Sequence, residues 1–148
     1  YQPTSDIEIT LLVPKKYVGM FGDKVKYVTG TDPKRLFSRL FPKFDLWHST
    51  DQRPRFKPYS LDTIYLLTIH DFNHEYEKSG FDLQWARRNM NKHIDRANHL
   101  IYISQFAAND GKRFCKGYNK PQSVIYNGVE SLTTCTDEKP EGIDASRT

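Results

Sequence analysis

The 148-residue sequence predicts an α/β fold: a three-layer, Rossmann-like domain with a mainly parallel sheet and helices on both sheet faces. Apolar runs of strand length alternate along the chain with segments of helical periodicity, which is typical of βαβ units. The run over residues 63–69 has no polar alternation, as expected of a strand buried on both faces of a parallel sheet. It ends in His70 and Asp71. Because ligands of open α/β sheets bind at the carboxyl ends of strands, we expect these two residues to face a cleft.

Composition and charge limit the class of protein. Hydrophobic residues make up 37% of the chain and charged residues 27%, so the sequence predicts a globular domain and not a disordered chain. The net charge of +4 is compatible with nucleic acid, an anionic membrane or a phosphorylated substrate. No block of lysine and arginine occurs, which favours a solvated surface with a slight positive bias, and we expect no nucleic-acid partner.

Cysteine usage and hydropathy bear on location. Cys115 and Cys135 form neither a disulfide framework nor a metal-binding pattern. The sequence contains no signal peptide and no membrane-spanning run. These observations predict a cytoplasmic protein, with peripheral attachment to the inner face of the membrane as a compatible variant.

The N-terminal part predicts two strands and a helix. Residues 6–14 alternate at first and then become wholly apolar, and residues 24–28 alternate cleanly, so both segments are typical of strands. Gly19 and Gly22 mark the loop between them. Residues 32–42 predict a helix, because Asp and Pro suit its start, apolar residues recur at helical spacing and a second Pro ends it.

The middle of the chain places a loop before the long buried strand. Residues 45–48 predict a short strand, and residues 49–59 predict a loop with two prolines. After the strand, residues 71–80 predict an irregular polar stretch, and Asp82 is expected to cap the longest helix. The apolar stripe of that helix consists of Leu83, Ala86, Met90, Ile94 and Ala97.

The C-terminal part predicts a strand, a helix and a last strand. Residues 99–103 are typical of a buried strand, and Ser104 is placed to cap a helix that runs to about Lys116. Backbone amides at Ser104 can also approach a phosphate, but capping is a sufficient explanation. Residues 123–126 predict the last strand.

The chain is expected to turn after that strand. Gly117 is expected to close the preceding helix, and Asn127 and Gly128 predict a tight turn with a positive φ at the glycine. Residues 1–129 then form the domain, and residues 130–148, which have little to bury, form a linker or tail.

Four segments follow one another at suitable spacing. They are Asp45-Leu-Trp-His48, Thr68-Ile-His-Asp71, Arg96-Ala-Asn-His-Leu-Ile-Tyr-Ile-Ser-Gln-Phe106 and Val124-Ile-Tyr-Asn-Gly-Val129. Together they resemble the N-terminal, acceptor-side domain of family 4 glycosyltransferases (group 1 type) of the GT-B fold, over about residues 5–130. The family usually has Ala-Asp and Ser-Glu-Phe where this chain has Ala97-Asn98 and Ser104-Gln105-Phe106. Both changes keep size and hydrogen-bonding capacity and lose a charge.

The resemblance implies a hexosyltransferase that moves a sugar from a nucleotide-sugar donor to an acceptor hydroxyl with retention of configuration, in polysaccharide or glycolipid biosynthesis. It implies no cofactor and no catalytic metal. The chain resembles the family domain without its first strand and Gly-rich loop, and nothing after Gly128 resembles the C-terminal domain with its Glu-x7-Glu motif. We therefore expect an acceptor-binding fragment that is inactive alone. Its expected partners are a sugar or lipid-linked acceptor, the donor-binding domain and an anionic membrane surface.

Three strand-end residues are candidates for chemistry. In the resembled family, His70 faces the interdomain cleft, where an imidazole can donate a hydrogen bond to a sugar hydroxyl or a phosphate; the alternative is a histidine bonded within the fold. Asp71 can orient His70 or act as a base, or it can cap the turn after the strand. His48 ends the neighbouring strand and opens onto the same cleft, unless it is packed. A metal site built from His70, Asp71 and His74 lacks an obvious further ligand, so no metal is expected.

Residues 52–59 of the loop over residues 49–59 form the candidate acceptor-binding segment. They include Arg53, Arg55, Phe56, Lys57 and Tyr59. Aromatic faces stack on sugars, and guanidinium groups hold phosphates. The alternative is a basic surface loop whose aromatic side chains pack down.

Two other functions remain compatible with the sequence. One is a Rossmann-like phosphate-ester hydrolase that uses His70 and Asp71. The other is a non-catalytic domain that binds an anionic membrane or polymer through its basic face.

Overall fold

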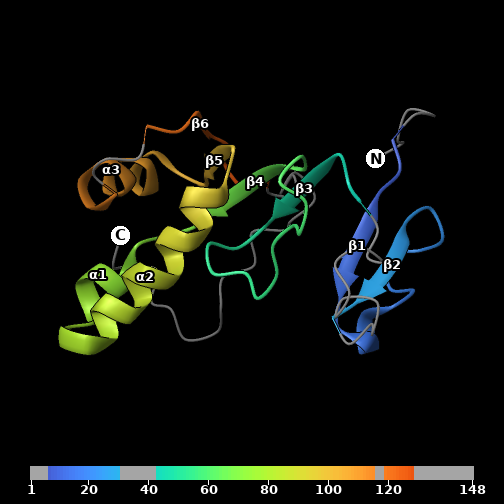
Figure 1. The fold of residues 1–148 in the computed structure, drawn as a ribbon, viewed down its shortest axis with the longest axis horizontal. Coiled ribbons are helices and arrows are strands. Elements are labelled where there is room, and N and C mark those ends of the chain that lie inside the picture. The colour runs from blue at the N-terminus through green and yellow to red at the C-terminus, as the bar shows by residue number, and fades with distance from the viewer. Residues whose placement is uncertain (1–6, 31–42, 116–118, 129–148) are drawn as a thin grey trace, which may run out of the picture.

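The computed structural model describes residues 7–30, 43–115 and 119–128, and its strands form two all-parallel sheets (Figure 1). The smaller sheet pairs β1 (Thr10–Val13) with β2 (Lys26–Thr29). The larger sheet has the order β3 (Leu46–Ser49), β4 (Ile64–Ile69), β5 (His99–Tyr102) and β6 (Gln122–Val124). This arrangement confirms the predicted α/β class and its parallel, Rossmann-like sheet.

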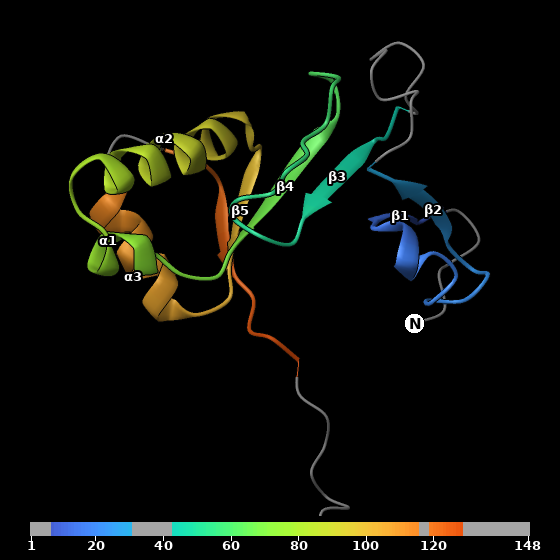
Figure 2. The same cartoon turned by 90° about the horizontal axis from the view of Figure 1, so that it is seen from below.

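The α-helices of the described residues gather at the larger sheet. They are α1 (Asn73–Glu77), α2 (Gly80–Arg96) and α3 (Gln105–Phe114). The short 3-10 helix η1 (Lys15–Tyr17) follows β1 at the smaller sheet. Figure 2 shows α1, α2 and α3 beside β4, β5 and β6, whereas β1 and β2 lie beyond β3. None of the helices in the described part of the chain has the length and apolar character needed to cross a bilayer.

The hydrophobic core lies between one face of the larger sheet and the helices α2 and α3. Leu67 stands opposite Leu100, and Ile69 opposite Tyr102, so these side chains share a face with Tyr65. All of these residues are buried. Because Tyr65 contacts α2 and Tyr102 contacts α3, both helices cover this face.

The opposite face of the larger sheet is less covered. Ile64 is 50% exposed, and Leu66 and Ile101 are partly exposed. The prediction that the strand over residues 63–69 is buried on both faces is therefore wrong for part of β4. Its residues that point toward the helices are fully buried, which explains why the run is apolar.

One segment expected to be irregular is helical. Residues 71–80 contain α1, whose start is held by Asp71, since Oδ1 of that carboxylate accepts the N–H of Asn73 at 3.0 Å. The carboxylate of Glu75 in the first turn interacts favourably with the helix dipole and stabilises α1. The ring of His74 is buried and holds the turn against the core. The apolar anchors are too few to give a helical period, so the pattern did not reveal this helix.

The start of the long helix also differs from the expectation. Asp82 was predicted as its cap, but α2 begins at Gly80, and Ser79 is the extended residue before it. Asp82 lies in the first turn, where a carboxylate stabilises the helix through the dipole. The predicted stripe is confirmed for Ala86, Met90 and Ile94, which are buried, and for Ala97, which is buried just after the helix, whereas Leu83 is half-buried.

Several smaller expectations can be compared directly. Ser104 caps α3, since its Oγ accepts the N–H of Ala107 at 3.1 Å. Gly19 and Gly22, which mark the predicted loop, both have positive φ. Gly128 does not, so the positive φ predicted for the turn there is wrong. The helix expected over residues 32–42, the closing role of Gly117 and the tail over 130–148 lie outside the described residues.

Gly111 allows α3 to approach the sheet closely. A Cβ at this position would lie 2.4 Å from the Tyr102 hydroxyl oxygen, closer than any side chain tolerates. Glycine in a helix interior normally costs stability, and here the close packing against β5 explains its presence.

Gly111→Ala is expected to lower the free energy of unfolding by about 1–3 kcal/mol, because the added methyl group forces α3 away from Tyr102. Urea unfolding measures this change. The matched control is Gly128→Ala, since a Cβ there meets nothing within 4 Å and the expected change is within about 0.5 kcal/mol. Equal effects of the two substitutions would contradict the close-packing explanation.

Candidate functional site

His70 stands at the carboxyl end of β4 and is fixed by the loop that follows β3. Its Nε2 lies 2.7 Å from the carbonyl oxygen of Thr50, and its backbone N–H donates to Oε1 of Gln52 at 3.1 Å. A carbonyl oxygen can only accept, so Nε2 carries the hydrogen, and in the tautomer with this single hydrogen Nδ1 carries a lone pair. The ring can therefore accept a hydrogen bond from a hydroxyl group.

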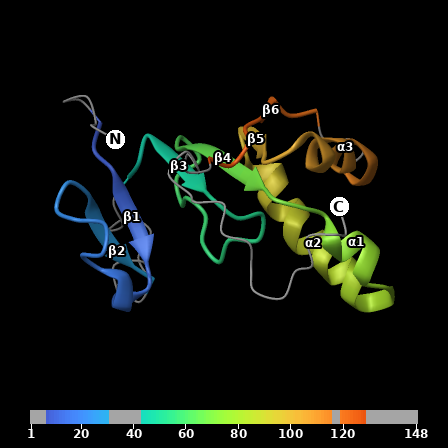
Figure 3. The same cartoon turned by 180° about the vertical axis from the view of Figure 1, so that it is seen from behind.

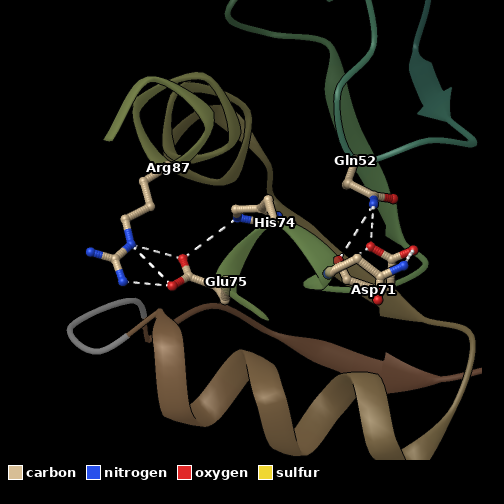
Figure 4. Close-up of polar contacts among 6 residues, drawn as sticks. Gln52, Asp71, His74, Glu75 and Arg87 are labelled. Carbon is tan, nitrogen blue, oxygen red and sulfur yellow. Dashed lines mark hydrogen bonds and ion pairs between the residues drawn. The ribbon is translucent and has the colours of Figure 1, made fainter. Parts of the chain in front are cut away.

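Asp71 is held by three donors (Figure 4). Its Oδ1 accepts the backbone N–H of Asn73 at 3.0 Å and Nε2 of Gln52 at 3.3 Å. Its Oδ2 accepts Nδ2 of Asn73 at 3.1 Å. Of the two roles considered for this carboxylate, the geometry favours the turn cap over the general base.

Gln52 connects the loop after β3 with the residues that follow β4. The sequence did not identify it as a site residue. Its side chain is buried at 4% exposure and uses both ends of the amide. Oε1 accepts from His70, while Nε2 donates to the carbonyl oxygen of Asp71 at 3.4 Å and to its carboxylate. A glutamine in a polar loop carries no sequence signal of burial, so only the fold shows this role.

His48 bonds to the neighbouring strand. Its Nε2 lies 2.8 Å from Oγ1 of Thr68, and partial burial lowers the pKa of the imidazole. The ring is therefore neutral at pH 7. It lines a pocket next to β1, and not the pocket that contains Arg53.

A basic pocket of about 620 Å³ lies between the loop after β3 and the exposed side of α2. The residues that line this basic pocket are Asp51, Arg53, Pro54, Arg55, Lys57, Trp85, Asn89, Lys92 and His93. Four side chains in this set are cationic and one is a carboxylate. Trp85 is 55% exposed, so part of its indole is available to a ligand.

The basic pocket has an ordered wall and a positive field. Oδ1 of Asp51 accepts the backbone N–H of Arg53 at 2.6 Å, which fixes the turn that carries both. Burial, followed by repulsion from Lys57 and Lys92, lowers the pKa of His93. That imidazole is neutral at pH 7, and the cations around it favour an anionic ligand.

The structure divides the predicted acceptor-binding residues. Arg53 and Arg55 line the basic pocket, whereas Phe56 and His48 line the pocket next to β1, which Arg55 also reaches. Tyr59 is exposed and lies in neither pocket. His70 and Asp71 also lie outside both pockets, at the base of the same loop.

Helix α2 contributes residues that the sequence did not assign to the site. Trp85, Asn89, Lys92 and His93 all line the basic pocket. The first three recur at helical spacing on the side opposite the apolar stripe. An exposed tryptophan beside a lysine on one helix face is the signal that could have found this half of the pocket.

The potential metal ligands are not assembled. No group of three or more metal-ligating side chains occurs within residues 7–30, 43–115 and 119–128. His74 is buried with Nε2 3.5 Å from Oε1 of Glu75, and burial lowers the pKa of His74. In this part of the chain Asp71 caps the turn before α1, and His74 is buried beside it.

Arg87 secures α1 against α2 through Glu75 (Figure 4). The guanidinium donates from Nε at 2.8 and 3.1 Å and from Nη2 at 2.6 Å to the two carboxylate oxygens. The Glu75 side chain is 3% exposed. The hydrogen bonds from Arg87 lower the pKa of Glu75, although burial opposes them.

Comparisons with protein-family models, curated protein sequences and solved structures find no match to this chain.

Arg87→Gln is expected to lower the unfolding temperature at pH 7, because it leaves the Glu75 carboxylate buried without its cation. The pKa of Glu75 is lower in the folded state than in the unfolded chain, so its ionisation stabilises the fold at any pH above the pKa of the unfolded chain. This stabilisation is lost as the pH falls through the pKa of the folded state. The difference between the native chain and the variant should therefore shrink below the ordinary glutamate value of 4.5. Thermal unfolding followed by circular dichroism at several pH values measures it.

The control is Arg88→Gln, which changes an exposed neighbour on α2 for which no ion pair is found among the described residues. It should leave the unfolding temperature nearly unchanged at every pH. A pH-independent loss of stability in Arg87→Gln would contradict the assigned role of the ion pair.

Proposed function

We propose that the protein is the acceptor-binding half of a retaining glycosyltransferase that uses a nucleotide-sugar donor. The basic pocket between the loop after β3 and α2 carries the proposal. Its volume of about 620 Å³ is in the range of pockets that bind small molecules. The resemblance of four segments to the acceptor-side domain of the family supports the reaction class, in polysaccharide or glycolipid biosynthesis.

The lining of the basic pocket suits an anionic sugar. Arg53 and Arg55 offer planar guanidinium groups that can hold a phosphate or carboxylate through paired hydrogen bonds. The exposed part of Trp85 offers an aromatic face on which a sugar ring can stack. An acceptor that combines a sugar with a phosphate uses both features, as a sugar phosphate or a lipid-linked sugar does.

His70 connects the basic pocket with the expected reaction. The loop that carries Arg53 and Arg55 also holds the imidazole through the Thr50 carbonyl. With Nε2 occupied, the lone pair of Nδ1 is the part of the ring that can receive a proton or hydrogen bond from an acceptor hydroxyl. Asp71 keeps a supporting role in this proposal, because its oxygens already hold the turn.

In the full-length protein, the double substitution Arg53→Gln/Arg55→Gln is expected to raise the KM for the acceptor at least about tenfold and to leave the KM for the donor nearly unchanged. Loss of the guanidinium groups removes hydrogen bonds to the acceptor anion only. The assay incubates the protein with a panel of nucleotide-sugars and candidate sugar-phosphate acceptors and detects the transferred hexose by mass spectrometry.

Arg88→Gln is the control, since this arginine lies on α2 outside the basic pocket. No transfer by the full-length protein with any donor would refute the enzyme class. If Arg88→Gln raised the KM for the acceptor as much as the double substitution does, the location of the acceptor site would be refuted.

A second candidate is a non-catalytic domain that binds an anionic polymer or membrane, and the four cations of the basic pocket favour it. Its binding should weaken steeply with salt, without any donor chemistry. The phosphate-ester hydrolase has less support, because Asp71 is committed to the turn. Metal-dependent release of phosphate from an ester by this chain would favour it.

A further inference from the structure

The two sheets turn toward each other two edges for which no partner strand occurs among the described residues. A pocket of about 510 Å³ separates β1 from β3, and every residue of both strands lines it. Successive side chains of a strand point to opposite faces, so a groove on one face would be lined by alternate residues only. A pocket lined by all residues of both strands is therefore open to the strand edges, and we call it the edge slot.

Backbone groups of both strands point into the edge slot. The carbonyl of Ile9 accepts from Lys26 of β2, so by the alternation of a strand the N–H and C=O groups of Thr10 and Leu12 point away from β2. The carbonyl of Asp45 accepts from Ile64 of β4, so those of Leu46 and His48 point away from β4. No backbone partner is found for these four residues within the described part of the chain.

Edge strands of natural sheets are protected by charges and prolines. Around the edge slot these residues stand outside the two strands: Pro14 directly follows β1, and Asp51, Pro54 and Arg55 lie in the loop after β3. The inner strands read Thr-Leu-Leu-Val in β1 and Leu-Trp-His-Ser in β3, with no lysine, acidic residue or proline. Their composition is typical of interior strands of a parallel sheet.

The directions of the two inner strands allow one strand between them. Their arrows point the same way in Figure 1 and in the view from behind (Figure 3), which share one line of sight. In Figure 2 the arrow of β2, the parallel partner of β1, is turned relative to that of β3, so the two sheets are rotated against each other. A strand placed between them can lie parallel to both when it continues the twist that is usual in a parallel sheet. It would join the described strands into one continuous parallel sheet.

We propose that the edge slot receives an extended, apolar peptide segment, which inserts as a parallel strand between β1 and β3. The segment comes from outside these 148 residues: residues 1–6 and 129–148 are mostly polar and contain prolines, and the apolar residues of 32–42 recur at the spacing of a helix between two prolines. Main-chain hydrogen bonds to both edges supply the affinity, and the apolar side chains that line the slot select uncharged, β-branched residues. This inference is independent of the proposed function.

The first test measures amide hydrogen exchange of the full chain by NMR, with a capped peptide of about six valine, isoleucine and threonine residues as the probe. Without peptide, the amides of Thr10, Leu12, Leu46 and His48 should exchange fast. With peptide, their exchange should slow by at least roughly tenfold, while amides of β6 remain unchanged. A peptide of the same composition with a central proline, which lacks a donor, should protect far less.

A pair of matched substitutions locates the binding. Leu46 and Ile64 are exposed to 51% and 50%, and both lie on strands of the larger sheet, but only Leu46 lines the edge slot. Leu46→Lys should abolish the peptide-induced protection, whereas Ile64→Lys should preserve it. The proposal would be overturned if the proline peptide protected these amides equally, or if neither peptide protected them. It would also be overturned if sedimentation showed that two copies of the chain associate through these edges.

Discussion

The amide of Gln52 is the interaction on which the candidate site depends. The connection from β3 to β4 has no helix, so the loop needs other means to keep one conformation. Gln52 is buried and bonds to His70 and Asp71 at the end of β4, which fastens the start of the loop. At its other end, Nη2 of Arg96 donates to the carbonyl oxygens of Ser60 and Thr63 at 2.7 and 3.0 Å. Between these two attachments the loop carries Arg53, Arg55 and Lys57, which line the basic pocket beside α2.

Periodic features of the fold could be predicted from the sequence, because burial imposes a period on the residues. The stripe of α2, the run of β4 and the cap at Ser104 follow from side chains that repeat or bond locally. Helix α1 has too few turns to show a period. The role of Gly111 could not be predicted, since it depends on where Tyr102 of another element comes to lie.

The candidate site was predictable only in part, for the same reason. Arg53 and Arg55 stand in a loop rich in charge, which composition reveals, and they do line the basic pocket. Gln52 looks like any polar loop residue, and its burial depends on the neighbouring strand end. His70 and Asp71 were recognised by their position after a buried strand. Their hydrogen bonds, which leave one nitrogen of the imidazole available and engage the carboxylate in the turn, depend on the fold and could not be predicted. The contribution of α2 required knowledge of which helix packs beside the loop.

The measurement that tests the account most directly is ligand binding by Gln52→Leu. Leucine keeps the approximate size of the side chain and removes its hydrogen bonds, so the loop should lose its attachment to β4 while the helices stay folded. Titration with glucose 6-phosphate, followed by tryptophan fluorescence, reports on Trp85 in the basic pocket. The account predicts binding at least about tenfold weaker than in the native chain, with an unchanged helical circular dichroism spectrum. Native-like binding by Gln52→Leu would contradict the claim that this amide positions the site.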